Sequence, residues 1–236
     1  GGGVIGVFSA LHMARKGLKV VILEKGRIAG EQSSRNWGWI RQHGRDPAEL
    51  PIMMEASRLW EEFDQQVNGR TGFNRRGVMY LSSTKEKQDK REAWLKTATE
   101  HGLDTIALSK TQLDKQLGRN STQQHRWIGA TYTASDACAE PWQAVPAIAE
   151  LAQSEGVIIR ESCAVRALDI EAGIIRGVIT ESGNIKATQV VVAGGAWSSL
   201  FLKQHGISIP QLSVRATVVR TSAIKEVFSS CAADEE

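Results

Sequence analysis

The chain begins with Gly1-Gly2-Gly3-Val4-Ile5-Gly6, which places three glycines at the spacing G-x-G-x-x-G. A helix-like stretch follows, and then an apolar run that ends at Leu23 and is followed at once by Glu24. Glycines at this spacing let a tight turn bring the amides of a helix N-terminus up to a pyrophosphate. An acid after the next strand can bind a ribose, and it disfavours the 2′-phosphate of NADP. This order of residues predicts a dinucleotide site, with FAD and NAD both open.

Each position of the turn has a predicted role in that chemistry. Gly1 allows the tight turn, Gly3 lets the pyrophosphate approach the backbone, and Gly6 lets the helix pack against the sheet. The amides of Val4 and Ile5 lie at the start of the helix, where they would bind phosphate oxygens.

The elements that must position this turn follow from the periodicity of apolar residues. The predicted helices are 3–16, 47–67, 84–101, 109–117, 141–155 and 196–204. The predicted strands are 18–23, 77–81, 127–133, 157–160, 164–170, 174–180, 189–193 and 214–221, and the tail 222–236 has no obvious partner. Residues 26–46 lack apolar periodicity, which indicates a long loop with a function of its own.

The composition is that of an ordinary globular protein: 42% of the 236 residues are apolar, 23% are charged, and the net charge is +3. Interspersed charges argue against nucleic-acid binding, and no apolar run is long enough for a transmembrane segment. The three cysteines, Cys138, Cys163 and Cys231, are far apart, which favours reduced thiols in a cytoplasmic compartment. Neither the cysteines nor the histidines have metal-ligand spacing, so we expect no metal site.

Three further segments favour FAD, by resemblance. The loop 31–42, EQSSRNWGWIRQ, resembles the flavin-contacting loop of the D-amino-acid-oxidase superfamily. The block 185–198, which contains VVVAGGAWS, resembles the strand and turn that return the chain to the flavin. Cys163-Ala164-Val165 is similar to the segment that precedes a two-stranded excursion in the family. The segments occur in the family's order, and the resemblance runs from Gly1 to about Thr221.

The resemblance implies an α/β fold, with a Rossmann-like FAD-binding domain and an interleaved mixed α+β substrate domain. We expect a discontinuous FAD-binding domain at 1–68 and 138–209, because the flavin-contacting segments bracket the middle of the chain. Part of the substrate domain would then lie at 69–137 and 210–236. The turn has no strand before it, and the family's C-terminal half is missing. We therefore expect an N-terminal fragment, truncated at both ends and inactive on its own.

The resemblance also assigns residues to the parts of FAD. Glu24, with the backbone of Lys25, would bind the adenosine ribose. The backbone of Val165 would hold adenine, and Gly194 would approach the flavin. The loop residues that would contact or support the phosphates, the ribityl chain and the ring are Gln32, Ser33, Ser34, Asn36, Trp37, Gly38 and Trp39. Arg35 stands where some family members carry a histidine that binds FAD covalently, so we expect non-covalent FAD.

Activity in this family rests on the cofactor. The resemblance implies oxidation of an amine or amino acid, with hydride transfer from the α-C–H to flavin N5 and hydrolysis of the imine to an oxo acid. Arg41 and His43 are the local candidates for substrate contact. Two alternatives stay open: a non-catalytic FAD-binding or electron-relay subunit of a heteromeric dehydrogenase, and an NAD-dependent Rossmann enzyme. A partner subunit, a quinone acceptor and peripheral association with the inner face of the membrane also stay open.

Overall fold

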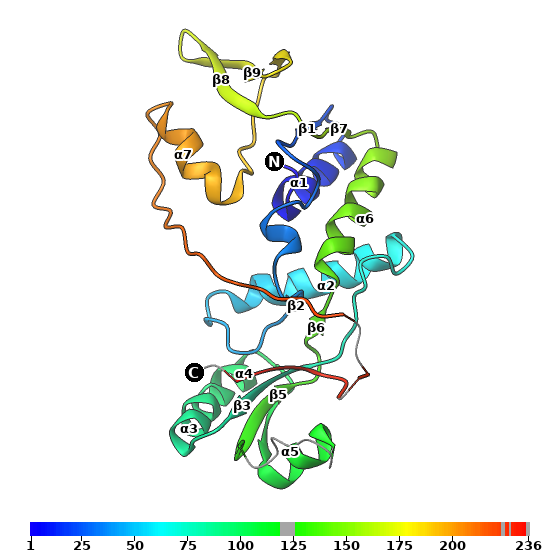
Figure 1. Cartoon of the computed structure of the whole chain (residues 1–236), viewed down its shortest axis with the longest axis vertical. Coiled ribbons are helices and arrows are strands. Elements are labelled where there is room, and N and C mark those ends of the chain that lie inside the picture. The colour runs from blue at the N-terminus through cyan, green and yellow to red at the C-terminus, as the bar shows by residue number, and fades with distance from the viewer. Residues whose placement is uncertain (119–125, 223–224, 227, 235–236) are drawn as a thin grey trace. The chain divides into compact units, whose positions relative to one another are not determined.

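The computed structural model describes residues 1–118, 126–222, 225–226 and 228–234 (Figure 1). Contacts divide them into a first unit, 1–37 and 141–218, and a second unit, 38–140 with the described part of 219–236. Both units mix helices and strands, which is the predicted fold class. The expected domain boundaries at 68 and 138 stay a prediction, and the contacts group residues 38–68 with the second unit.

Two helices and a short parallel strand pair position the glycine turn in the first unit. The elements of this unit are α1 (Val4–Arg15), β1 (Val21–Leu23), η1 (Gln32–Ser34), α6 (Pro141–Ser154), β7 (Ile158–Arg160), β8 (Val165–Glu171), β9 (Ile174–Thr180), β10 (Gly183–Lys186), η2 (Gly195–Trp197) and α7 (Ser198–Lys203). β1 pairs in parallel with β7, and α1 packs beside α6 (Figure 1). Their buried side chains include Val7, Leu11, Ile22, Ile148 and Ala152.

Local chain signals account for the ends of these elements. Gly17, at φ +81°, follows the last turn of α1, as expected for a helix that ends at a left-handed glycine. β8 and β9 form an antiparallel pair whose turn holds Ala172 and Gly173 at φ +50° and +78°. β10 adds to β9 and was not expected from the sequence.

A four-stranded sheet forms the centre of the second unit. The elements of this unit are β2 (Trp39–Ile40), α2 (Leu50–Gln66), β3 (Val78–Ser82), α3 (Lys85–Ala93), α4 (Leu95–Glu100), β4 (Thr105–Ser109), α5 (Lys110–Leu117), β5 (Gly129–Thr133), β6 (Ala137–Cys138) and β11 (Cys231–Ala233). The sheet order is β11-β3-β5-β4, and every residue of β3 is buried. The cluster of buried apolar residues consists of Met79, Leu81, Leu108, Leu113, Leu117 and Ala130.

Three expectations about strands were wrong. Residues 189–193 and 214–221 form no strand in the described structure, because neither segment has a hydrogen-bonded strand neighbour. The tail does have a partner: β11 pairs in parallel with β3, with Cys231 opposite Val78. Strand β4 was missed because its five residues lie between two helices without a marked alternation of polarity. Each error concerns a pairing between distant segments, which the local pattern does not contain.

Candidate functional site

The glycine turn packs directly against the segment that carries Gly194. A Cβ atom on Gly6 would lie 1.9 Å from the carbonyl oxygen of Gly1, and one on Gly1 would lie 2.2 Å from that of Ala193. Both distances are far below van der Waals contact. Only glycine therefore allows these backbone segments to pack so closely. The turn lies beside the segment 185–198, which resembles a flavin-contacting part of the family.

A serine hydroxyl lies at the first amide of α1. The amide of Val4 donates to Ser33 Oγ at 2.9 Å, and a Cβ on Gly3 would approach this oxygen to 3.1 Å. Gly3 is the N-cap of α1 and provides no side-chain cap, so an acceptor must come from elsewhere. Ser33 provides it, and a hydroxyl can also donate to a second acceptor. This cradle fits a phosphate oxygen between the helix amides and Ser33.

Glu24 is held beneath the turn by two backbone amides. Its side chain is buried, Oε2 accepts from the amide of Gly2 at 2.7 Å, and Oε1 accepts from the amide of Gly26 at 2.8 Å. Each carboxylate oxygen can accept a further hydrogen bond, so the group fits a ribose diol. Gly2 was missed by sequence reasoning because it fills a variable position of the motif.

The side chain of Lys25 contacts both the loop 31–42 and the segment 185–198. Its Nζ lies 2.8 Å from Glu31 Oε1 and 3.9 Å from the centroid of the Trp197 ring. The hydrogen bond from Lys25 lowers the pKa of Glu31 below its ordinary value. Sequence reasoning gave Trp197 no role, and no local signal pairs a tryptophan with a lysine so far away in the chain.

The loop 31–36 of the first unit is ordered by its own side chains. Asn36 Nδ2 donates to the carbonyls of Gln32 and Ser33, each at 3.1 Å, and Ser34 Oγ donates to that of Glu31 at 3.3 Å. Asn36 therefore holds the loop that precedes it, and its support of a flavin-contacting turn stays a prediction. The side-chain oxygen of Gln32 lies 3.0 Å from where a Cβ would sit on Gly195.

The residues predicted at the adenine end belong to the same unit. The amide of Cys163 donates to the carbonyl of Glu24 at 2.8 Å, which places the start of β8 beside the predicted ribose ligand. Val165, the first residue of β8, is half-buried. The first unit therefore brings together the turn at 1–6, Glu24, Lys25, the loop 32–36 and Gly194, with Val165 nearby in the chain.

The remaining predicted ring contacts lie around the start of β2. Trp37 is 62% exposed, whereas Gly38 and Trp39 are half-buried. Gly38 has φ +73°, and its carbonyl accepts from the amide of Ala139 at 2.8 Å. Trp39 lies opposite Cys138 in the β2–β6 pair. Their contacts with a flavin ring stay a proposal.

His43 is an interior residue of the second unit. It is 2% exposed, and its ring nitrogens lie 3.3 Å from the carbonyl oxygen of Val78 and 2.9 Å from Thr131 Oγ1. The ring also stacks on Trp94 at 5.5 Å. Burial, the largest cause, lowers the pKa of His43 to about 4. The histidine is therefore neutral at physiological pH and enclosed, and its surroundings give no support to substrate contact.

The guanidinium of Arg41 contacts a backbone carbonyl and lies near an aromatic ring. Its Nη1 donates to the carbonyl of His43, and its guanidinium lies 5.5 Å from the centroid of the Tyr80 ring. The side chain is half-buried. These contacts hold the segment after β2, and a substrate role for Arg41 stays a proposal.

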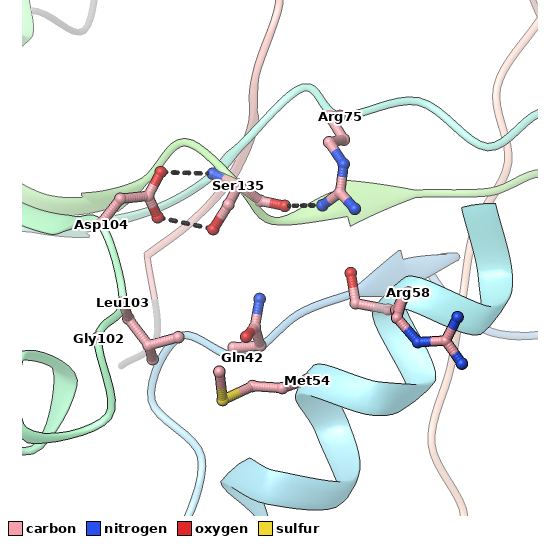
Figure 2. Close-up of a pocket in the computed structure, with 9 residues that line it drawn as sticks. Gln42, Met54, Arg58, Arg75, Gly102, Leu103, Asp104 and Ser135 are labelled. Atoms are coloured by element: carbon pink, nitrogen blue, oxygen red, sulfur yellow. Dashed lines mark hydrogen bonds between the residues drawn. The ribbon is translucent and has the colours of Figure 1, made fainter. Parts of the chain in front are cut away.

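The second unit also contains a cavity of 340 Å³ (Figure 2). Asp104 accepts from the amide of Ser135 at 2.9 Å and from its hydroxyl at 2.6 Å, and Arg75 Nη1 donates to the Ser135 carbonyl at 2.6 Å. Arg58 pairs with two glutamates of its own helix. None of the predicted cofactor residues lines this cavity, and its charged groups already have partners.

Metal ligands and membrane helices are absent from the described residues. No cluster of three or more His, Cys, Asp or Glu side chains there could hold a metal ion. Within the same residues, no helix combines the length and the apolar character needed to cross a membrane.

Comparison with known proteins identifies the family. The model of the FAD dependent oxidoreductase family matches residues 1–234. Sarcosine oxidase subunit beta from Arthrobacter sp is 28% identical over 217 residues, which cover 89% of this chain and 53% of that protein. Mitochondrial dimethylglycine dehydrogenase from Rattus norvegicus is 24% identical over 228 residues, 96% of this chain and 26% of that protein.

A solved structure agrees with these matches. L-amino acid deaminase from Proteus vulgaris superposes with a TM-score of 0.82 at 32% identity, over 89% of this chain and 49% of that chain. The chain thus spans between about a quarter and about half of the relatives it matches. The glycine turn and the buried acid fit a dinucleotide, the family match identifies it as FAD, and this chain belongs to the FAD dependent oxidoreductase family.

Proposed function

We propose that the complete gene product oxidises an amine or amino acid with FAD, and that the first unit described here holds the nucleotide half of the cofactor. The observation that carries the proposal is the meeting of four separate sequence segments in that unit. They are the turn at 1–6, Glu24, Ser33 and Gly194. Sarcosine oxidase subunit beta and L-amino acid deaminase are named for amine and amino-acid substrates, which supports this donor class.

The nucleotide would be held by groups that already face one another. The amides of Val4 and Ile5, with the hydroxyl of Ser33, would bind the pyrophosphate at the positive end of α1. The two oxygens of Glu24, fixed by the amides of Gly2 and Gly26, would accept the ribose hydroxyls. The amides of Gly2 and Gly26 already fix Glu24, so the ribose would need little rearrangement, whereas the amide of Val4 would share its bond to Ser33 with a phosphate oxygen.

The chain's part in the reaction is to bind, orient and exclude water. When bound, FAD supplies the hydride acceptor for the carbon that bears the nitrogen, and the imine product hydrolyses in water to an oxo acid. Gly38 and Trp39 would lie along the ring, and Gln32 would reach the ribityl chain or the phosphates. Glu24 and Ser33 would determine how tightly FAD binds and would take no part in hydride transfer.

A flavin spectrum of the complete gene product tests the proposal. The purified protein is mixed anaerobically with D- and L-amino acids, glycine, sarcosine, dimethylglycine and proline derivatives, and the absorption bands of oxidised flavin are followed. We expect at least one of these donors to bleach the bands. A preparation that binds no flavin even when FAD is added would overturn the cofactor site, whatever the substrate.

A second function is favoured by one comparison. The relative from Arthrobacter is named as a subunit, which supports an FAD-holding or electron-relay role within a heteromeric enzyme. The same spectrum separates the two functions. Bound flavin that none of the amines reduces, but that a chemical reductant bleaches, supports the subunit role, and bleaching by an amine supports the catalytic one.

A further inference from the structure

Two of the three thiols are neighbours in the second unit. Cys138 ends β6 and Cys231 begins β11, and each thiol shifts the pKa of the other, which places the two side chains close together. Both residues are half-buried. Cys163 belongs to the first unit and is buried, which makes it an internal control.

The backbone holds the pair through one short segment. Cys138 forms a β-bridge with Asn74, with hydrogen bonds of 2.8 and 2.9 Å between their amides and carbonyls. The amide of Cys231 donates to the carbonyl of Gly77 at 3.0 Å. Gly77 has φ +72°, so the segment bends between the two attachment points. Because both cysteines are tied to this bend, their proximity is part of the fold.

The charges around the pair make the two thiols unequal. The pKa of Cys138 is lowered to about 7, first by the hydrogen bond from Cys231 and also by Arg76, against the effects of burial and Glu140. The pKa of Cys231 is raised by the same hydrogen bond, by burial and by Asp136, although Arg76 opposes this. Cys138 is therefore the more acidic thiol of the pair and is partly ionised at neutral pH, whereas Cys231 keeps its proton.

We propose that Cys138 and Cys231 are a hydroperoxide-sensitive thiol pair that closes to a disulfide. The Cys138 thiolate attacks the peroxide oxygen, the O–O bond breaks, and a sulfenic acid and a hydroxide or alkoxide ion form. The sulfur of Cys231 then displaces the sulfenic oxygen as water, with loss of its own proton. The two thiols are oxidised by two electrons in total, and the peroxide is reduced by two.

The order of the steps follows from the pair itself. Once Cys138 is a sulfenic acid, the negative charge that held the proton on Cys231 is gone, so Cys231 becomes available as the second nucleophile. Cys138 also lies opposite Trp39 in the β2–β6 pair. The pair therefore adjoins the strand that contains a predicted flavin contact.

Peptide mapping of the complete, FAD-loaded gene product tests the proposal. After treatment with hydrogen peroxide at neutral pH and alkylation of the remaining thiols, we expect a peptide pair joined through Cys138 and Cys231, two mass units lighter than the separate peptides. Cys163 is expected to be alkylated. Alkylation of both Cys138 and Cys231, or a disulfide that includes Cys163, would overturn the proposal.

Matched variants test the unequal roles. Cys231→Ser should stop at a sulfenic acid on Cys138 that dimedone traps, whereas Cys138→Ser should give no dimedone adduct at Cys231. Arg76→Gln should slow the reaction at pH 7, because loss of the guanidinium charge raises the pKa of Cys138 and lowers its thiolate fraction. Arg75→Gln is the control, because Arg75 is bonded to Ser135 and Glu61 instead. Equal rates in the two arginine variants contradict the assigned electrostatics and the proposal with it.

Discussion

Asp136 and His43 are the two most deeply buried titratable residues beside the sheet of the second unit. Asp136 has no exposed surface, and its carboxylate accepts from the amide of Gln42 at 2.7 Å and from that of His43 at 3.2 Å. Burial, the largest cause for both groups, raises the pKa of Asp136 to about 6 and lowers that of His43 to about 4. Each group is therefore neutralised by the fold at a pH where it would be charged in the unfolded chain.

The two shifts predict opposite pH dependences of stability. Between pH 4 and 6.5 the unfolded chain binds the His43 proton more tightly than the folded chain does. The free energy of unfolding therefore increases as pH rises, by up to about 3 kcal/mol. Between pH 3.8 and 6 the folded chain binds the Asp136 proton more tightly, so stability is lost as pH rises, by a similar amount. These two contributions partly cancel in the native protein.

Substituting each residue in turn separates the pH-dependent contributions of His43 and Asp136 to stability. In urea unfolding at pH 4, 5 and 6.5, the stability difference between the native chain and His43→Gln should shift in favour of the native chain as pH rises. The difference between the native chain and Asp136→Asn should shift the other way. Differences that stay constant across this range for both variants would show that neither group titrates as assigned.

At the scale of elements, the start of α1 depends on the absence of side chains at its glycines. The Cβ of an alanine at position 6 would lie 1.9 Å from a backbone oxygen, so the turn or the helix must move. An alanine at position 26 would meet nothing nearer than 3.7 Å, at the side chain of Glu24. The two substitutions add the same methyl group in very different surroundings.

We therefore expect Gly6→Ala to lower FAD affinity at least tenfold, which corresponds to about 1.4 kcal/mol, while Gly26→Ala binds FAD as the native protein does. Titration of the apoprotein with FAD, followed by the quenching of flavin fluorescence, measures both. Equal affinities in the two variants would mean that the turn does not contact the cofactor.

The elements that the sequence predicts well are those with local signals. The glycine turn, α1, β1 and the β8–β9 pair were expected because caps, turn residues and apolar runs lie within each segment. The pairing of β11 with β3 could not be expected, since the three residues of β11 have no pattern of their own. For the site, Glu24 and Ser33 were predicted by motif and resemblance, and their contacts with the cofactor stay predictions. Gly2 and Trp197 were missed because their roles arise only when distant segments fold together.

At the scale of the whole molecule, the chain builds two units with separate cores although it passes repeatedly between them. Leu11 and Ile148 are buried in the first unit, and Leu113 and Met79 are buried in the second. Each core is assembled from segments far apart in sequence. A defect in one core therefore has its direct effect on the packing of that unit.

Leu113→Ala should reduce the stability of the second unit by about 2–5 kcal/mol, because Leu113 has no exposed surface and leaves a cavity. Hydrogen exchange measures this by residue. We expect faster exchange in β3, β4 and β5, and unchanged exchange in α1 and α6. Leu212→Ala is the control, since Leu212 is 94% exposed. Hydrogen exchange that becomes faster to the same extent in both units would show that they unfold together.

The pairing of β1 with β7 has a consequence for how this chain can vary. Only three residues of each strand pair, yet the amide of Glu24 donates to the carbonyl of Arg160 at 2.9 Å, and β8 starts a few residues later. Side chains alternate between the faces of a strand, so a slip by one residue reverses them all. The length of the segment 157–164 is therefore as important for the fold as the amino acids that it contains. A single insertion there would shift the start of β8 against Glu24, and so displace the predicted adenosine contacts, without changing the contact between Val4 and Ser33 at the predicted phosphate site.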